Sequence, residues 1–427
     1  MTRSRRAGLV AGGILLVGLA AVAGRDHCAR RTPGPPEVLV SAFSSGPLLA
    51  GAASVPLDIP FPAVVAGYGV PRATVSAARV PVRARALVVQ SGAVRVGVVA
   101  LDILVGDAGL QSEIRSAVAD LGLTDLWVAV THTHSGPGGY ASNRVAELAG
   151  TGLLRREVRD AVVSAAAGAL TSSARKLAPV TLHLGEGTLD GLIGARSPPA
   201  DVDPRLTRLV LDGQEGPVAQ LLILACHPTL VPRPPPGLDP DWPGRLADRE
   251  GELGHGLTLV LQGAVGNASA ALTESNGERL GHFVAAVAAA ADALPLAPVP
   301  AALGVARASV GLPGPDASRL APSVARPLVA NLLCASAPAR SDVALLRLGP
   351  LLLLGVPAEP SASAGRVLEE AAGASRAVSL VDGYLGYVET PEHLGARVGE
   401  SERQLLGPSF LDALARAGRA ARASLPP

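Results

Sequence analysis

Two histidines separated by a single residue open the most distinctive polar segment of this chain. His132 and His134 lie in the segment THTHSGPGG, residues 131–139, directly after a run of apolar residues. In an extended chain, side chains two positions apart point to the same side, so both imidazoles would face one region. Imidazole nitrogens are common zinc ligands, which makes this pair a candidate metal-binding or proton-transfer site. Such a pair also occurs as an ordinary solvated or hydrogen-bonded pair.

Three further polar side chains follow apolar runs in the same way. They are His227, Ser269 and Glu359. Strands that end in loops are where α/β folds place binding and catalytic groups. A third imidazole and a carboxylate would complete a zinc ligand set with the histidine pair.

Each of these residues also has a simpler structural interpretation. A histidine after a buried strand can be a hydrogen-bonded core residue, and a carboxylate before a helix can stabilise the helix N-terminus. A serine in a turn can be a capping residue, and Ser269 lacks the Gly-x-Ser-x-Gly pattern of a nucleophile elbow. All four tyrosines of the chain follow a glycine, which places their rings beside tight backbone: Tyr68, Tyr140, Tyr384 and Tyr387.

The elements that would position these residues alternate between hairpins and helices. The predicted hairpins are residues 82–101, 206–225 and 343–356. Single strands are predicted at residues 126–130 and 257–261, and residues 377–388 are predicted to be extended. The predicted helices are residues 107–121, 153–170, 278–294 and 401–421. Proline-rich stretches predict loops at residues 197–204, 228–243 and 295–327. Hairpins mixed with helices predict an α/β fold with a mixed β-sheet core flanked by helices. No linker divides the chain, so a single large domain is expected.

Composition excludes several classes of protein. The chain has 427 residues, of which 48% are hydrophobic and 17% charged, and its net charge is +1. This balance argues against wholesale disorder. It also provides no basic surface for nucleic acid, and two Trp, four Tyr and four Phe are too few for a base-stacking platform. We therefore expect no nucleic-acid partner.

The N-terminus has the pattern of an export signal. Three arginines within the first six residues precede an uncharged stretch, residues 7–23, which ends in the small-x-small pattern AVA. This pattern predicts a secretory signal peptide, and an uncleaved membrane anchor is the alternative. Residues 1–35 are assigned to this leader and a linker, and residues 36–427 to the domain. We expect an exported protein, secreted or anchored in the cell envelope, in which Cys226 and Cys334 could form one disulfide bond.

The histidine segment resembles a known family signature. The sequence HTHSGPGGY, residues 132–140, closely matches that of the neutral/alkaline (non-lysosomal) ceramidases. Further segments resemble this family in the same order along the chain: AGY (66–68), VRARALVV (82–89), ARSP (195–198), CHPT (226–229), DWPG (241–244), VPAE (356–359) and GYVETPE (386–392). The resemblance extends over residues 55–408, and the nine-residue histidine motif is its most specific part.

The resemblance implies a zinc-dependent amidase of one large domain. The family cleaves the amide of N-acylsphingosines into a fatty acid and a sphingoid base, so a lipid-like N-acyl amide is the implied substrate, with association at a membrane surface. The zinc ligands implied by the resemblance are His132, His227, Glu359 and Tyr387. The implied pocket residues are His134 and Arg196, which would hold the substrate carbonyl or polar head, and Ser269, at the position of the family's active-site serine.

The chain departs from the family pattern at three places. The family serine motif reads Gly-Asp-x-Ser-Pro-Asn, whereas Asn267 replaces the acid here. A second pocket tyrosine of the family falls near Gly399, and we expect no immunoglobulin-like C-terminal domain, because the sequence stops at Pro427. Two alternatives therefore stay open: a hydrolase of another acyl amide or ester, and a non-catalytic zinc-bearing envelope protein.

Overall fold

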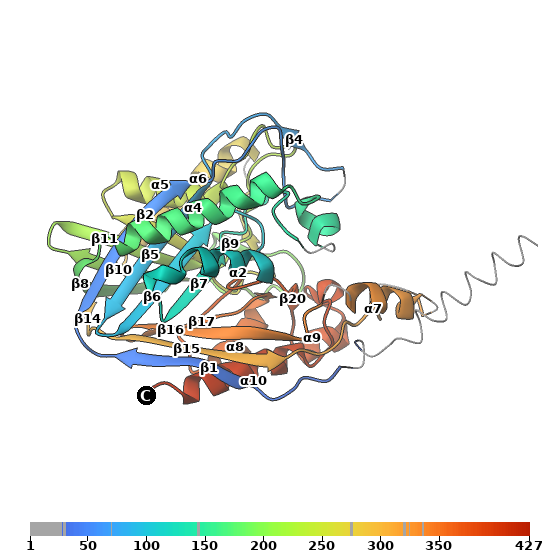
Figure 1. Ribbon diagram of the computed structural model, residues 1–427. Helices are drawn as coiled ribbons and strands as arrows, with labels where there is room; N and C mark the ends of the chain where they lie inside the picture. Colours follow the sequence, from blue (N-terminus) through green and yellow to red (C-terminus); the bar gives the residue numbers. More distant parts are fainter. Residues whose placement is uncertain are drawn as a thin grey trace, which may run out of the picture.

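Two β-sheets packed face to face form the centre of the molecule, and helices cover their outer faces (Figure 1). The computed structural model describes residues 28, 31–69, 71–142, 146–273, 276–318, 322–323, 325–334 and 337–427. The apolar stretch of the predicted leader lies outside these residues. The fold is α/β with mixed sheets in a single domain, as the sequence predicts.

The larger sheet joins antiparallel hairpins to two parallel pairs. Its strands are β12 (Leu257–Gln262), β11 (Gly216–Leu224), β10 (Arg205–Gly213), β8 (Ala178–Thr188), β2 (Leu48–Pro56), β5 (Arg83–Ser91), β6 (Val94–Leu101) and β7 (Asp125–Val130), in that spatial order, with β14 (Ala297–Val299) paired to β8. The β5–β6 and β10–β11 hairpins are antiparallel, whereas β6–β7 and β11–β12 are parallel. The parallel pairs direct the ends of β7, β11 and β12 into loops that carry polar residues.

The smaller sheet packs one face against the larger sheet. Its strands, in spatial order, are β1 (Glu37–Ser44), β15 (Leu303–Gly311), β16 (Arg340–Leu348), β17 (Leu351–Gly355) and β19 (Arg376–Val378). Leu87 and Trp127 of the larger sheet share an apolar core with Val305, Leu346 and Leu353 of the smaller sheet. These side chains are almost fully buried, so the interface between the sheets is a hydrophobic core.

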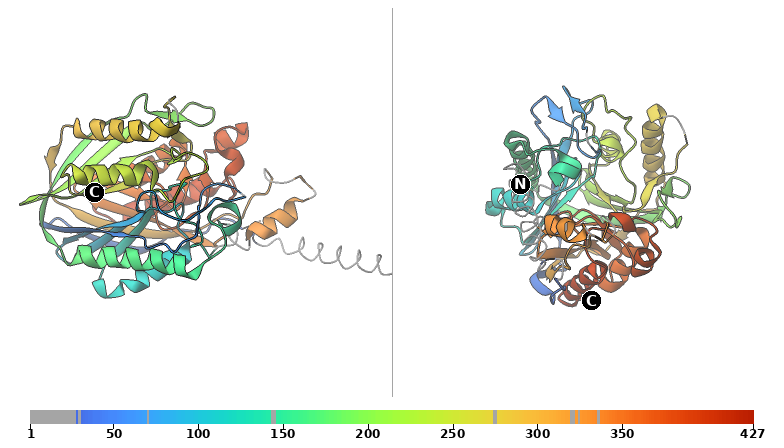
Figure 2. Two further views of the ribbon diagram at one scale, coloured as in Figure 1. Left: turned by 90° about the horizontal axis from the view of Figure 1, so that it is seen from above. Right: turned by 90° about the vertical axis from the view of Figure 1, so that its right-hand side faces the viewer.

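Amphipathic helices cover the outer faces of both sheets (Figures 1 and 2). The helices are α2 (Ala108–Ala117) and α4 (Arg156–Ala174) over β5 to β7, α5 (Asp241–Glu252) and α6 (Asn276–Asp292) over β10 to β12, and α8 (Ala362–Ala372) and α10 (Phe410–Ala423) over the smaller sheet. In α4, Val158, Val162, Ala166 and Leu170 are buried at intervals of four residues, which gives the helix one apolar face.

Short elements surround the loops at the strand ends. They are β3 (Ala63–Val64), β4 (Thr74–Val75), β9 (Ile193–Ala195), β13 (Ala268–Ala270), β18 (Glu359–Pro360), β20 (Tyr387–Val388), η1 (Ala119–Leu121), η2 (Glu147–Thr151), α7 (Arg326–Cys334), α9 (Pro391–Ala396) and η3 (Ser401–Arg403). Two of the small pairings, β13 with β9 and β18 with β20, bring distant parts of the chain together.

The structure confirms the three predicted hairpins but corrects two predicted loops. Residues 295–327, expected to be a proline-rich loop, contain β15, which pairs with β1 and β16 inside the smaller sheet. The prolines lie on both sides of β15, and none lies within it, so every residue of this strand keeps its N–H group. The predicted loop at residues 228–243 likewise includes the first residues of α5.

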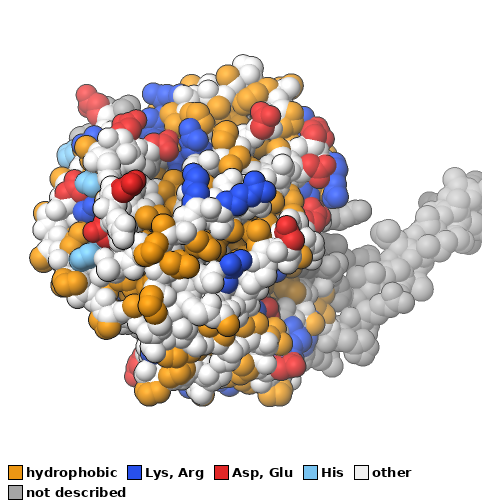
Figure 3. Space-filling view, turned by 60° about the vertical axis from the view of Figure 1, so that its left-hand side comes forward, with side chains coloured by type: hydrophobic (Ala, Val, Ile, Leu, Met, Phe, Trp, Pro, Cys, Tyr) orange, Lys and Arg blue, Asp and Glu red, His pale blue; other side chains and the backbone are white. Residues whose placement is uncertain are grey.

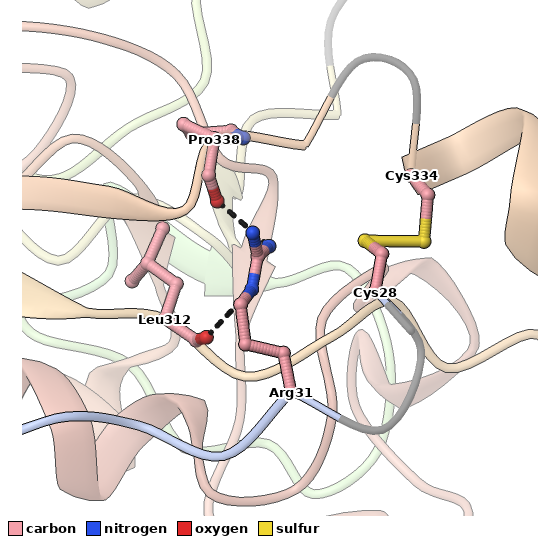
Figure 4. The surroundings of a disulfide bond; sticks show 5 residues. All are labelled: Cys28, Arg31, Leu312, Cys334 and Pro338. Carbon is pink, nitrogen blue, oxygen red and sulfur yellow. Dashed lines mark hydrogen bonds between the residues drawn. A yellow bond between two sulfur atoms is a disulfide. The ribbon is translucent and has the colours of Figure 1, made fainter. Parts of the chain in front are cut away.

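The disulfide bond differs from the expected one. Cys334 is bonded to Cys28, which is 306 residues away in the sequence, and Cys226 is a buried free thiol (Figure 4). Cys226 lies at the end of β11 under α5 and α6, and it packs there as a small apolar residue. The linker is thus attached to the domain that follows it.

The surface carries charges of both signs. On the face seen in Figure 3, acidic and basic side chains are interspersed with apolar ones, in keeping with a net charge of +1. In the part of the chain that the structure describes, no helix combines the length and the apolar character that crossing a bilayer requires.

Candidate metal and catalytic site

Three loops at the ends of strands bring two histidines and a carboxylate together. His132 follows β7, His227 follows β11, and Glu359 follows β17. The distance from Glu359 Oε2 to His132 Nε2 is 3.3 Å and to His227 Nε2 is 3.0 Å. All three side chains are buried. The predicted ligands thus converge although more than 200 residues separate His132 from Glu359 in the sequence.

A third imidazole belongs to the same cluster. One ring nitrogen from each of His132, His134 and His227 lies within 4.8 Å of the others. The resemblance implies a substrate-holding role for His134, and the structure places it directly beside the implied metal ligands. His132 has a φ of 67°, so the backbone here is left-handed, whereas the sequence predicts an extended chain. The two imidazoles converge because of this turn and not through strand alternation.

Backbone carbonyls fix which nitrogen of each imidazole faces the cluster. The Nδ1 atoms of His132, His134 and His227 lie 2.7, 2.9 and 3.1 Å from the carbonyl oxygens of Leu104, Gly67 and Ala268. A carbonyl oxygen can only accept, so each Nδ1 carries a hydrogen and each Nε2 is the nitrogen that faces the cluster. Histidines that bind metals through Nε2 have this arrangement.

The cluster leaves buried acceptors without hydrogen-bond partners. Within the described residues, Nε2 of His132, Nε2 of His134 and Oε2 of Glu359 are buried and make no hydrogen bond. Buried unpaired acceptors are costly unless something else satisfies them. Imidazole nitrogens and a carboxylate in one place are the donor set that zinc prefers, so these residues fit a zinc ion.

Tyr387 reaches the cluster through a short strand pairing. β18 and β20 are parallel, with Glu359 opposite Tyr387, and the Glu359 N–H donates to the Gly386 carbonyl at 3.0 Å. The Tyr387 hydroxyl lies 3.4 Å from Nε2 of His227. The pairing therefore carries the fourth implied ligand to the same place as the other three.

Tyr384, for which the sequence predicts no role, contacts Glu359 directly. Its hydroxyl donates a hydrogen bond of 2.8 Å to Glu359 Oε1. This bond holds one carboxylate oxygen and leaves Oε2 turned toward the histidines. A glycine before the tyrosine was the available sequence signal, but it is shared by all four tyrosines.

Burial and mutual charge set the protonation of the cluster. Burial lowers the pKa of His227 to about 4 and holds the pKa of His134 well below its usual value, with the neighbouring imidazoles acting in the same direction on His134. Burial by itself would raise the pKa of Glu359, but His132 and His227 bring it well below the usual range. A neutral His134 and a neutral His227 beside an ionised carboxylate are ready to bind a cation at neutral pH.

Arg196 contacts the hydroxyl of Tyr387. Its Nη2 donates to the Gly266 carbonyl at 2.6 Å and to the Tyr387 hydroxyl at 3.2 Å, and it is 3.2 Å from Glu400 Oε1. These contacts position the phenol of Tyr387. Within the described residues, Nε of Arg196 is buried and makes no hydrogen bond. Contact of Arg196 with a substrate stays a prediction.

Ser269 lies on β13, one residue beyond the carbonyl that holds His227. It is paired with Gly194 of β9, and its hydroxyl makes no hydrogen bond within the described residues. Asn267 is buried, and its Oδ1 accepts the N–H of Ala362 at the start of α8 at 2.9 Å. The amide that replaces the family acid thus has a structural partner.

Close contacts show whether Glu359 caps a helix and whether a tyrosine fits at position 399. Glu359 does not cap α8, because the Ser361 hydroxyl accepts the Ala364 N–H at 3.3 Å and is the N-cap. Gly399 has a φ of 63°, and a Cβ there would overlap the Glu389 carboxylate. No tyrosine could therefore replace Gly399 without rearrangement, and the described residues supply Tyr384 as the second phenol beside Glu359.

Gly67 is required by the close approach of its loop to His134. It has a φ of 100°, and a Cβ at this position would lie 2.7 Å from the Cα of His134. Only glycine combines this conformation with such an approach. Its carbonyl is thereby placed against Nδ1 of His134.

An apolar cavity adjoins the cluster. The cavity has a volume of about 290 Å³ and includes His132, His134, Glu359, Tyr384 and Tyr387 in its lining. The apolar part of the lining includes Leu104, Val105, Ala141, Leu333, Ala337, Leu385, Leu405 and Leu406. An apolar cavity with a few converging polar groups is the usual form of a site for a small amphipathic molecule.

Known proteins share this fold and part of this sequence. Residues 60–208 match the family described as neutral/alkaline non-lysosomal ceramidase, N-terminal. The structure of neutral ceramidase from Pseudomonas aeruginosa is similar with a TM-score of 0.75 and 19% identity, over 90% of this chain and 76% of that chain. A structure described as ceramidase complexed with C2 is similar with a TM-score of 0.73 and 18% identity, over 89% of this chain and 76% of that chain.

No curated protein matches the chain. At these identities the solved structures establish the shared fold, and the matched residues 60–208 include His132 and His134 of the cluster. The chain is thus similar to the neutral/alkaline non-lysosomal ceramidases, in sequence over residues 60–208 and in fold over 90% of its length.

Proposed function

We propose that this protein is a zinc-dependent amidase that hydrolyses the N-acyl bond of ceramide-like lipids to a fatty acid and a sphingoid base. One observation carries the proposal: the unpaired acceptors of His132, His134 and Glu359 converge, buried, beside an apolar cavity. The family match and the solved ceramidase complexed with C2 support the choice of substrate class.

His132, His227, Glu359 and Tyr387 would hold the zinc ion. Nε2 of His132, Nε2 of His227 and Oε2 of Glu359 lie close together, and the Tyr387 hydroxyl lies near them. They provide nitrogen and oxygen donors of the kind that zinc binds. A zinc ion in this ligand set supplies a Lewis acid for the substrate carbonyl and lowers the pKa of water to about 7.

The proposed reaction is hydrolysis of the amide by one water molecule. The water oxygen adds to the acyl carbon, the C–N bond breaks, and the leaving nitrogen takes up a proton. His134 is neutral because burial lowers its pKa, so it can accept a proton and pass it to the amine. Arg196 holds the Tyr387 hydroxyl and keeps a positive charge close to where the oxyanion develops.

Ser269 is the second candidate nucleophile. The free hydroxyl has no base in hydrogen-bonding contact within the described residues, so attack by Ser269 would need the substrate or a rearrangement to bring a base to it. Trapping of an acyl group on Ser269 would establish it as the nucleophile. Full activity of Ser269→Ala would exclude both nucleophilic and orienting roles.

A disulfide bond and the predicted leader support export. Disulfides persist in oxidising compartments, and the Cys28–Cys334 bond is compatible with such a location. We propose that the protein is secreted or anchored in the cell envelope, and that it meets its lipid substrate at a membrane surface.

The size of the cavity favours one alternative substrate class. Its volume of about 290 Å³ lies at the lower end of the ~300–1,000 Å³ of ligand pockets. An acyl amide or ester with a shorter chain than ceramide would fill such a space. A panel of substrates that differ in acyl length and head group distinguishes the two.

Metal analysis combined with hydrolysis of a labelled ceramide tests the proposal. We expect one zinc per chain and release of labelled fatty acid, and we expect His132→Ala to lose both. His183→Ala is the matched control, because this histidine lies on β8 away from the cluster. Purified protein that contains no zinc after supplementation and hydrolyses no acyl amide would contradict the proposal.

A further inference from the structure

The segment that precedes β1 is fastened to an insertion between two strands of the smaller sheet. Residues 313–338 connect β15 to β16 and contain α7. Leu312 and Ala339 close the base of this insertion, where the Leu312 N–H donates to the Ala339 carbonyl at 2.9 Å. We use the name clasp for Cys28 and Arg31 together with their contacts to this insertion.

Arg31 binds both ends of the insertion (Figure 4). Its Nε donates to the Leu312 carbonyl at 3.1 Å, and its Nη2 donates to the Pro338 carbonyl at 2.8 Å. The Arg31 carbonyl accepts the Gly314 N–H at 2.9 Å. One arginine thus joins the two ends of the insertion through three hydrogen bonds.

The disulfide bond fastens the middle of the same insertion. Cys334, at the end of α7, is bonded to Cys28, and their Cα atoms are 5.7 Å apart. Among the α7 side chains that the structure describes, Ala330 is buried, and the others are half-buried or exposed. The covalent bond therefore ties the end of α7 to the segment that precedes β1.

The fastened insertion forms part of the wall of the substrate cavity. Leu333 precedes Cys334, and Ala337 and Pro338 follow it within four residues; all three line the cavity together with His132 and Glu359. Pro315 lines it from the other end of the insertion, and the Asp316 N–H donates to the carbonyl of Leu405, another lining residue, at 2.8 Å. A change in the position of α7 would therefore change the apolar wall but not the metal ligands.

We propose that the Cys28–Cys334 disulfide is a redox-sensitive clasp that sets the shape of the acyl-binding wall and so determines the chain length of the amide that the enzyme accepts. The inference rests on the proposed function. A dithiol reductant donates two electrons and two protons to the disulfide, which yields the two cysteine thiols, and the reductant becomes a disulfide itself. Release of Cys334 then lets Leu333 and Ala337 move away from the cavity.

Substrate binding and hydrolysis as a function of chain length test the clasp. The samples are oxidised protein, the same protein treated with dithiothreitol, and the variant Cys28→Ser/Cys334→Ser. For a long-chain N-acyl amide we expect KM to rise on the order of 10-fold in the two samples without the bond, because apolar contacts of the acyl chain are lost. For an N-acetyl amide we expect KM and kcat to stay unchanged, and zinc content should be the same in all three samples.

Two controls separate the clasp from general damage. Dithiothreitol should have no further effect on the double variant, and Arg31→Ala should reproduce part of the KM increase while the disulfide stays intact. Because the reductant acts on folded wild-type protein, the test does not depend on the folding of the variant. Equal KM values for the long-chain amide with and without the bond would overturn the proposal.

A measurement without turnover distinguishes failure of the clasp from failure of the proposed function. Hydrogen–deuterium exchange in residues 325–334 should increase on reduction, and the affinity for a fluorescent fatty acid should fall on the order of 10-fold. If oxidised protein hydrolyses no amide but shows both effects, the proposed function fails and the clasp stands. If hydrolysis occurs and neither effect does, the clasp fails.

Discussion

At the scale of single residues, the candidate site depends on hydrogen bonds made away from its centre. Three backbone carbonyls fix the histidine tautomers, and the Tyr384 hydroxyl holds one oxygen of Glu359. Burial raises the pKa of Tyr384 well above its usual value, and the nearby Glu359 acts in the same direction. Tyr384 therefore stays a hydrogen-bond donor at neutral pH, and it keeps Oε2 of Glu359 free for a cation.

Tyr384→Phe is expected to weaken zinc binding without removing a ligand. The variant loses the 2.8 Å hydrogen bond that orients Glu359, and loss of such an outer contact typically costs 10–100-fold in metal affinity. Competition with a chromophoric chelator measures this affinity. Tyr140→Phe is the matched control, because the Tyr140 hydroxyl accepts the Val105 N–H at 3.1 Å and touches no member of the cluster. Equal zinc affinities of Tyr384→Phe and wild type would contradict the assigned role.

The pH dependence of the stability of metal-free protein should reveal His227. Its pKa is about 4 in the folded chain, because it is buried, and about 6.5 in an unfolded chain. Between these values the unfolded state binds more protons, so the free energy of unfolding falls as pH decreases from ~6.5 toward 4. The contribution of one such group is about 1.4 kcal/mol per pH unit within this window.

Thermal or urea denaturation in the presence of a chelator measures this slope. His227→Gln should show a smaller loss of stability between pH 7 and pH 5, whereas His183→Gln on β8 should keep the wild-type slope. Identical slopes for wild type and His227→Gln would show that the buried imidazole is not the source.

The convergence of His132, His227, Glu359 and Tyr387 was predictable from the family resemblance, and not from elementary spacing. The expectation of an extended His132 was wrong, since its φ is 67°. Tyr384 and the path of Arg196 to Tyr387 were not predictable, because both depend on contacts across more than 20 positions of the sequence. A preceding glycine could not single out Tyr384 when Tyr140 has one too.

At the scale of elements, local signals were sufficient for hairpins and insufficient for isolated strands. The β5–β6 and β10–β11 turns contain glycines whose conformational freedom is visible in the sequence, and these hairpins form as predicted. β15 was missed because prolines flank it, and β18 and β20, of two residues each, are too short for any periodicity. Yet the β18–β20 pairing is what places Glu359 beside Tyr387.

Gly67→Ala tests the loop that supports His134. A Cβ at Gly67 would lie 2.7 Å from the Cα of His134, and the φ of 100° is unfavourable for alanine. We expect a loss of stability of about 1–3 kcal/mol and a fall in kcat/KM, because the loop must move away from the imidazole it holds. Denaturant unfolding and steady-state kinetics measure both effects.

A neighbouring glycine offers a matched control for this substitution. At Gly69 no atom lies within 4 Å of the position that a Cβ would take, so Gly69→Ala should leave stability and kcat/KM close to wild type. Equal behaviour of the two variants would mean that the contact with His134 carries no energy.

At the scale of the whole molecule, the cluster joins the two sheets at one end of their shared core. His132 and His227 extend from the larger sheet, and Glu359 follows β17 of the smaller one. Arg307 of β15 makes a second connection, at 3.0 Å from Asp125 of β7 and 2.6 Å from Asp382. This buried ionic contact joins β15 of the smaller sheet to β7 of the larger one.

Zinc should therefore stabilise the entire domain and not only the loops. A ligand that binds the folded state alone raises the free energy of unfolding by about 4 kcal/mol when its concentration is 1,000 times Kd. Because the ligands come from both sheets, unfolding of either sheet destroys the site, so we expect one cooperative transition that moves to higher temperature with zinc. Differential scanning calorimetry of protein treated with a chelator and then titrated with zinc measures the shift. Glu359→Gln, which loses the carboxylate charge but keeps the shape of the side chain, should show a much smaller shift. A zinc-dependent transition confined to part of the heat absorption would instead mean that the metal stabilises one sheet and that the two sheets unfold independently.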